Sequence, residues 1–102
     1  MSFANHATRA FTAMSVQKNA PSASGVFGIS SAREWIYIGE TDDLQRQLME
    51  YLSETNTFVK ARTPTGFTFE LCSAGSRVAR QSALVRELRP VGNQLEQSHE
   101  TT

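Results

Sequence analysis

Two glutamines occupy positions where helical periodicity predicts the buried side of a helix. Gln47 lies three residues after Leu44, and Gln81 lies three residues before Leu84. Residues three or four apart share one face of a helix. A buried amide without a partner costs about 1–3 kcal/mol, so each glutamine needs a hydrogen bond. Either the two amides bind backbone or water at the edge of the core, or both helices direct polar groups toward a shared cleft.

The apolar pattern predicts the elements that position these amides. We expect strands at 25–29, 34–38 and 67–72, with the first two joined as a hairpin, and helices at 42–53 and 76–88. The first helix would begin at Thr41 as N-cap, and Pro90 would end the second. This order fits an α+β fold with a small three-stranded antiparallel sheet flanked by helices.

Each predicted helix has an apolar inner stripe. In the first helix it consists of Leu44, Leu48, Tyr51 and Leu52, and in the second of Val78, Leu84, Val85 and Leu88. A loop with one helical turn is expected between residues 55 and 66.

The second predicted strand is apolar on both sides. Alternation places Trp35 and Tyr37 on one face, and Ile36 and Ile38 on the other. A strand with two apolar faces must be covered on both sides, so we expect it at the centre of the sheet.

The chain divides into three segments around one domain. Residues 1–24 are expected to form an N-terminal helical extension, since apolar residues recur at helical spacing from Phe3 to Met14, and Pro21 would prevent the helix from continuing. Residues 25–93 form the main domain, and 94–102 a polar tail. The 102 residues are enough for one domain with a modest core.

Ten basic and ten acidic residues leave the chain without net charge, whereas nucleic-acid binders normally present a positive surface. The charge is unevenly distributed, because residues 40–54 carry a net charge of −4 and residues 74–90 carry +3. The two segments are either solvated helix faces of opposite sign or parts of a binding surface.

No apolar run approaches the roughly 20 residues needed to cross a bilayer, and the N-terminal residues lack the apolar core of a secretory signal. Cys72 is the only cysteine, which excludes an intramolecular disulfide and a cysteine metal cluster. We therefore expect a cytoplasmic protein without membrane contact.

The order of the motifs resembles the GIY-YIG nuclease domain. The chain reads Gly-Val-Phe at residues 25–27, Tyr-Ile-Gly at 37–39 and Thr-Asp-Asp-Leu at 41–44. A Pro-x-x-Asn sequence follows the second helix and ends at Asn93. The resemblance extends over residues 25–93 and implies the same fold.

The resemblance also implies a site. Enzymes of this family hydrolyse phosphodiesters with one divalent metal, which a glutamate of the second helix holds. An arginine of the first helix neutralises phosphate charge, and tyrosines of both strand motifs position or deprotonate water. The matching positions here hold Gln81 for the glutamate, Gln47 for the arginine and Phe27 for the first tyrosine. Tyr37 is unchanged, and Tyr51 and Asn93 are supporting matches.

These replacements remove charge at the centre of the implied chemistry. The amide of Gln81 is a poor ligand for Mg²⁺, Gln47 is uncharged, and Phe27 lacks the hydroxyl. The resemblance thus indicates a catalytically impaired nuclease-like domain that needs no cofactor and either has an accessory role or binds DNA or RNA backbones weakly. Arg77 and Arg80 would make the phosphate contacts, with Arg46 and Tyr51 contributing from the first helix.

Two alternatives remain open. An active endonuclease would need Mg²⁺ or Mn²⁺ and a substitute carboxylate, for which Glu50 and Glu70 are the candidates. The other alternative is a protein-interaction module that binds no nucleic acid and whose partner the sequence does not identify.

Overall fold

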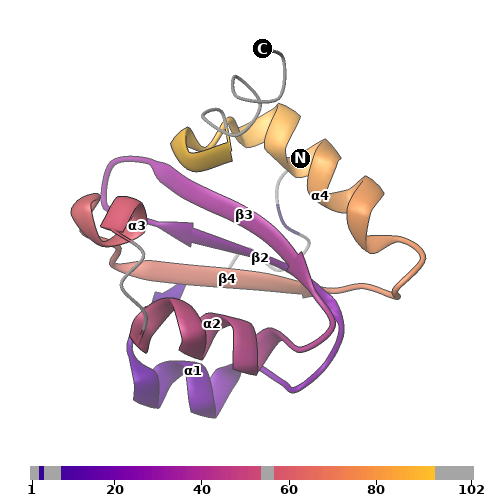
Figure 1. The fold of residues 1–102 in the computed structure, drawn as a ribbon, viewed down its shortest axis with the longest axis horizontal. Helices are drawn as coiled ribbons and strands as arrows, with labels where there is room; N and C mark the ends of the chain where they lie inside the picture. Colours follow the sequence, from indigo (N-terminus) through magenta and orange to yellow (C-terminus); the bar gives the residue numbers. More distant parts are fainter. Residues whose placement is uncertain (1–2, 4–7, 54–56, 94–102) are drawn as a thin grey trace.

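The computed structural model describes residues 3, 8–53 and 57–93. In chain order the elements are β1 (Arg9–Ala10), α1 (Ala13–Asn19), β2 (Gly25–Ser30), β3 (Trp35–Thr41), α2 (Leu44–Ser53), α3 (Thr57–Ala61), β4 (Gly66–Leu71) and α4 (Arg77–Leu88), as Figure 1 shows. The α+β class and the three predicted strands are confirmed, as are the two main helices.

The sheet has four antiparallel strands rather than three. Their order is β1-β4-β2-β3, and the additional strand β1 pairs Arg9 with Phe67 of β4. A two-residue strand has no alternation for sequence analysis to detect.

The prediction of a helix from Phe3 to Met14 was also wrong. The structure places α1 later, from Ala13, with the Thr12 hydroxyl accepting a hydrogen bond from the Ser15 N–H. Residues 4–7 of the expected helix lie outside the described residues.

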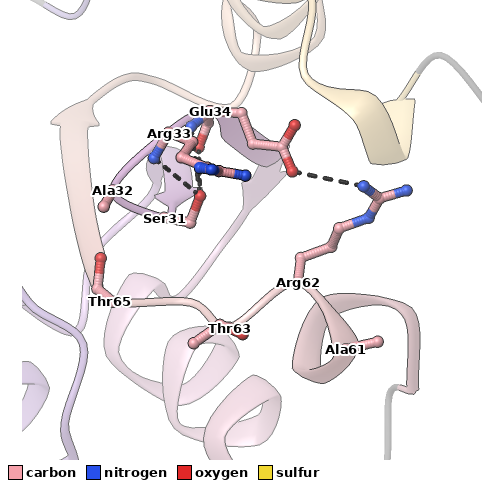
Figure 2. Close-up of a pocket in the computed structure, with 8 residues that line it drawn as sticks. All are labelled: Ser31, Ala32, Arg33, Glu34, Ala61, Arg62, Thr63 and Thr65. Carbon is pink, nitrogen blue, oxygen red and sulfur yellow. Dashed lines mark hydrogen bonds and ion pairs between the residues drawn. The ribbon is translucent and has the colours of Figure 1, made fainter.

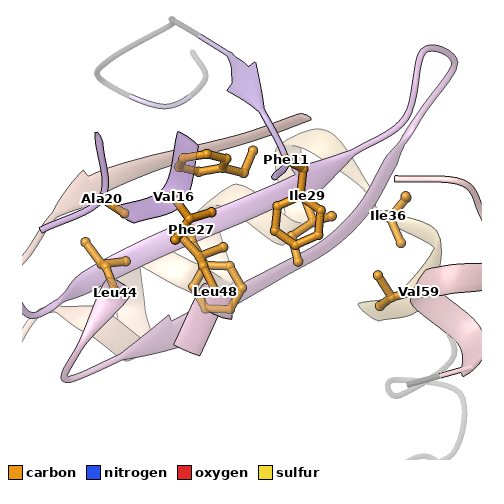
Figure 3. Close-up of a cluster of buried hydrophobic side chains, with 10 residues drawn as sticks. Phe11, Val16, Ala20, Phe27, Ile29, Ile36, Leu44, Leu48 and Val59 are labelled. Atoms are coloured by element: carbon orange, nitrogen blue, oxygen red, sulfur yellow. The ribbon is translucent and has the colours of Figure 1, made fainter. Parts of the chain in front are cut away.

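Helices cover both faces of the sheet. In Figure 1, α1 and α2 lie on one face and α4 on the other. The larger apolar cluster, on the α1 and α2 face, consists of Phe11, Val16, Ala20, Phe27, Ile29, Ile36, Leu44, Leu48, Val59 and Phe67 (Figure 3). On the α4 face, the buried residues are Phe3, Val26, Ile38, Leu84 and Val85. The N-terminal residues therefore contribute to both clusters.

β3 is an edge strand, so its expected central position is wrong. Its two apolar faces are explained by helices on both sides of the sheet, which cover an edge strand as well as a central one. The expected sharing of faces is also wrong, because the pairing with β2 shifts at Ile29 and Ser30. The resulting bulge leaves Ile36 as an extra residue. Trp35 therefore packs with Ile38 on the α4 side, and Tyr37 packs on the α2 side.

The predicted start of α2 and one predicted inner residue of α4 were wrong. Asp43, not Thr41, caps α2, since its carboxylate accepts a hydrogen bond from the Arg46 N–H at 3.0 Å. Thr41 is still part of β3. Val78 was expected to be inward but is 63% exposed. Its neighbour Arg77 faces the sheet, and one residue corresponds to about 100° of helix rotation.

Candidate functional site

Three aromatic rings from three elements pack together beside β3. The ring centroids of Phe27 and Tyr51 are 5.8 Å apart, those of Tyr37 and Tyr51 5.8 Å, and those of Phe27 and Tyr37 6.3 Å. Pairing of β2 with β3 places Phe27 opposite Gly39. A Cβ atom at Gly39 would lie 2.6 Å from Phe27 Cζ, so a glycine is needed there for the ring to fit. The structure thus brings together three of the predicted site residues, and we call them the ring cluster.

A second group of predicted residues meets at Ile38, the next residue along β3. The N–H of Ile38 donates to Asn93 Oδ1 at 2.7 Å, and its carbonyl accepts from Asn93 Nδ2 at 2.9 Å. The same carbonyl accepts from Gln81 Nε2 at 3.0 Å. The buried Asn93 amide therefore bonds to the edge of β3 as a neighbouring strand would.

The two glutamines have different environments. Gln81 has a backbone partner, the first of the two alternatives considered from the sequence. Gln47 is half-buried on α2, one turn before Tyr51. Because α2 and α4 cover opposite faces of the sheet, no hydrogen bond joins the two side chains in the described part of the chain. Gln47 lies on the same helix as Tyr51 of the ring cluster.

Two arginines of α4, Arg77 and Arg80, are paired with carboxylates of the sheet. Arg77 Nε lies 2.7 Å from Glu40 Oε1, and Arg80 Nε lies 2.8 Å from Glu70 Oε2. The Nη2 atom of Arg80 makes a second hydrogen bond of 3.0 Å to Glu70 Oε1. The hydrogen bonds that the Arg80 guanidinium donates to Glu70 raise the pKa of Arg80. The pairs join α4 to two strands and compensate the charges predicted to contact phosphate. The sequence did not identify Glu40 as a partner because 37 residues separate it from Arg77.

The carboxylates considered for metal binding are also in ion pairs. Glu50 lies 3.8 Å from Arg46 Nε on α2, and Arg46 also contacts Asp42 at 2.8 Å. Glu70 faces α4 on the other side of the sheet. Among the described residues, no group of three or more His, Cys, Asp or Glu side chains could hold a metal ion.

None of the helices in residues 8–53 and 57–93 combines the length and apolar character needed to cross a membrane.

The fold is similar to solved structures of a nuclease domain. No known family description matches the chain, and no curated protein matches its sequence. The GIY-YIG N-terminal endonuclease domain of UvrC from Thermotoga maritima, bound to its catalytic magnesium, superimposes with a TM-score of 0.62 at 20% identity. The match covers 74% of this chain and 91% of that domain. A tyrosine-to-phenylalanine mutant of the same domain gives a TM-score of 0.62 at 21% identity, covering 74% and 90%.

The solved mutants allow a comparison of spacing. In three of them a single tyrosine of the UvrC domain is replaced by phenylalanine, and the three positions are separated by 10 and 14 residues. The same intervals separate Phe27 from Tyr37 and Tyr37 from Tyr51. All three mutants were solved with the catalytic divalent cation bound. The ring cluster thus has the same spacing as these tyrosines.

Proposed function

We propose that this chain, which has the GIY-YIG nuclease fold, binds nucleic-acid backbones without cleaving them by metal-assisted hydrolysis. The observation that carries this proposal is the hydrogen bond from Gln81 Nε2 to the Ile38 carbonyl at 3.0 Å. It occurs at the position where the resemblance implies the metal-binding glutamate.

The side chain at position 81 acts as a hydrogen-bond donor in this fold. An ionised glutamate accepts hydrogen bonds only, so its oxygen would face the Ile38 carbonyl oxygen without a proton between them. A hard divalent cation, in turn, prefers a carboxylate oxygen to a neutral amide. The side chain that suits this backbone contact is therefore unsuited to holding the cation.

The replacements at positions 27 and 47 differ in how strongly they argue against hydrolysis. Phe27 alone does not argue against metal binding, because the phenylalanine mutant of the UvrC domain at the first of the three spaced tyrosines was solved with its cation. Gln47 supplies no positive charge for the phosphoryl oxygens. Arg46 is its neighbour but is paired with Asp42. The absence of a carboxylate at position 81 and of a positive charge at position 47 together supports binding without hydrolysis.

The binding part of the proposal is limited by charge compensation. The net charge is zero, and three predicted phosphate contacts, Arg46, Arg77 and Arg80, are each in an ion pair. We therefore expect a dissociation constant in the non-specific range of about 10⁻⁴–10⁻⁶ M, increasing with salt.

The first experiment is a cleavage assay. The purified protein is expected to leave linear, branched and single-stranded DNA intact in Mg²⁺ or Mn²⁺, because Gln47 and Gln81 occupy the positions of the family's arginine and glutamate. Tyr37→Phe serves as the control for contamination. Metal-dependent cleavage that disappears in Tyr37→Phe would show that the chain is an active endonuclease.

The second experiment tests the amide at position 81. Gln81→Glu is expected to reduce the free energy of unfolding by about 1–3 kcal/mol at neutral pH, because a carboxylate cannot donate to the Ile38 carbonyl. Denaturant unfolding with and without Mg²⁺ measures this.

The pH provides an internal control for Gln81→Glu. The protonated carboxyl can donate to the Ile38 carbonyl, which raises its pKa in the folded state. The loss of stability should therefore be absent below the unfolded glutamate pKa of about 4.3 and develop as the pH rises through the folded pKa. A variant as stable as wild type at neutral pH, and stabilised further by Mg²⁺, would contradict the assigned role of Gln81.

A further inference from the structure

A hollow of about 380 Å³ lies between two loops at one end of the sheet. One loop is the turn between β2 and β3, and the other connects α3 to β4. Figure 2 shows both loops with the eight lining residues, which are Ser31, Ala32, Arg33, Glu34, Ala61, Arg62, Thr63 and Thr65. We call this hollow the loop pocket.

Hydrogen bonds hold the loops of the pocket in place. The Ser31 N–H donates to the Glu34 carbonyl at 2.9 Å, and the Ser31 hydroxyl oxygen accepts from the N–H groups of Arg33 and Glu34. The Thr65 N–H donates to the Ser30 carbonyl at 2.9 Å, which joins the two loops. Since the backbone is already fixed, a ligand would not have to order it.

The loop pocket brings two arginines together, and one of them has no ion-pair partner among the described residues. Neither Arg33 nor the exposed Lys60 beside the pocket forms an ion pair with a described residue. Arg62 NH1 lies 3.5 Å from Glu34 Oε2, and both side chains are substantially exposed, at 44% and 35%. Arg33 thus has no carboxylate partner among the described residues, whereas Arg77 and Arg80 on α4 each have one.

The side chains that line the pocket suit a phosphate group. Guanidinium groups donate paired hydrogen bonds to phosphate oxygens, and threonine hydroxyls such as those of Thr63 and Thr65 add neutral donors. Contacts of this kind position a nucleic-acid backbone without reading its sequence.

We propose that the loop pocket is the phosphate-contact site for the nucleic-acid backbone, with Arg33 and Arg62 as the main contacts. This inference rests on the proposed function and replaces the α4 arginines as the binding surface. Glu34 precedes Tyr37 by three residues along the chain, roughly 10 Å at the rise of a strand. The pocket residue Glu34 is thus near Tyr37 along the chain.

Glu34 limits the affinity of the pocket. Phosphate competes with its carboxylate for Arg62, and an exposed ion pair at 3.5 Å is weak enough to be exchanged. Removing the Glu34 charge should therefore strengthen binding. A role confined to holding the two loops together predicts no such gain.

The experiment measures fluorescence anisotropy of a labelled DNA duplex at several salt concentrations. Arg33→Ala/Arg62→Ala is expected to weaken binding about ten-fold at low salt and to reduce the slope of log K against log salt by about two. Glu34→Gln is expected to tighten binding several-fold. The matched control is Lys18→Ala/Arg86→Ala, which removes two exposed charges elsewhere and should change affinity less than two-fold. Thermal melting verifies that each variant is folded.

Each result identifies which proposal fails. Binding by wild type that is unchanged in Arg33→Ala/Arg62→Ala would overturn the pocket assignment and leave the proposed function standing. Equal losses in the pocket variant and the control would also overturn it, since they indicate only net charge. Absence of binding at low salt would overturn nucleic-acid binding itself, and the pocket assignment with it.

Discussion

Phe27→Ala is expected to lower the free energy of unfolding by about 3–5 kcal/mol, the largest effect of any substitution considered for this protein. The Phe27 side chain is 1% exposed and contacts Tyr37 and Tyr51 in the ring cluster. Its removal leaves a cavity beneath both tyrosines, because Gly39 opposite has no side chain to fill the space. Chemical denaturation of wild type and variant measures the loss.

Two variants provide controls for the Phe27 prediction. Met14→Ala removes a side chain that is 79% exposed and should change stability by no more than about 0.5 kcal/mol. Phe27→Leu retains most of the buried volume and should lose clearly less than Phe27→Ala. A loss below about 1 kcal/mol for Phe27→Ala would mean that the ring cluster is not part of the core.

Asn93→Ala is the second large effect, with an expected loss of about 2–4 kcal/mol. The Asn93 side chain is 4% exposed, and its amide bonds to both backbone groups of Ile38. Without it, the N–H of Ile38 loses its partner and the carbonyl retains only Gln81. Hydrogen exchange at the Ile38 amide, measured together with the unfolding free energy, would locate the effect at β3.

Asn93→Asp separates the two hydrogen bonds of Asn93. The carboxylate still accepts from the Ile38 N–H but cannot donate to the Ile38 carbonyl, so stability should fall at neutral pH. The protonated carboxyl donates, which raises its folded pKa, and stability should recover below the unfolded aspartate pKa of about 3.9. An Asn93→Ala variant as stable as wild type would show that water satisfies the edge of β3 equally well.

The sequence alone predicted the main elements and the resemblance that led to the site. Short apolar runs identified β2 and β3, alternation identified β4, and helical spacing identified α2 and α4, because each of these signals lies within a few neighbouring residues. The same spacing predicted the buried positions Leu44, Leu48 and Leu84. Local patterns were sufficient because β2 and β3 are apolar on both faces, whereas α2 and α4 bury one face along much of their length.

Features that depend on two distant segments required the tertiary structure. The strand β1 is formed only by pairing with β4, and the bulge at Ile36 arises from the register between β2 and β3. Neither has a pattern of its own within its segment. A two-residue strand is too short for alternation, and the bulge reverses the alternation on which the prediction for Trp35 and Tyr37 was based.

The pairing of charged side chains also depends on the tertiary structure, and it decides where a ligand could bind. The sequence counted Arg77 and Arg80 as a positive helix face, whereas the fold pairs each with a carboxylate of a strand. Conversely, Arg33 and Arg62 lie 29 residues apart in the sequence, and only the fold brings their two loops together around one pocket. Electrostatic potential depends on distances through space, so sequence determined which charges exist, and only the fold decided which of them remain available to a ligand.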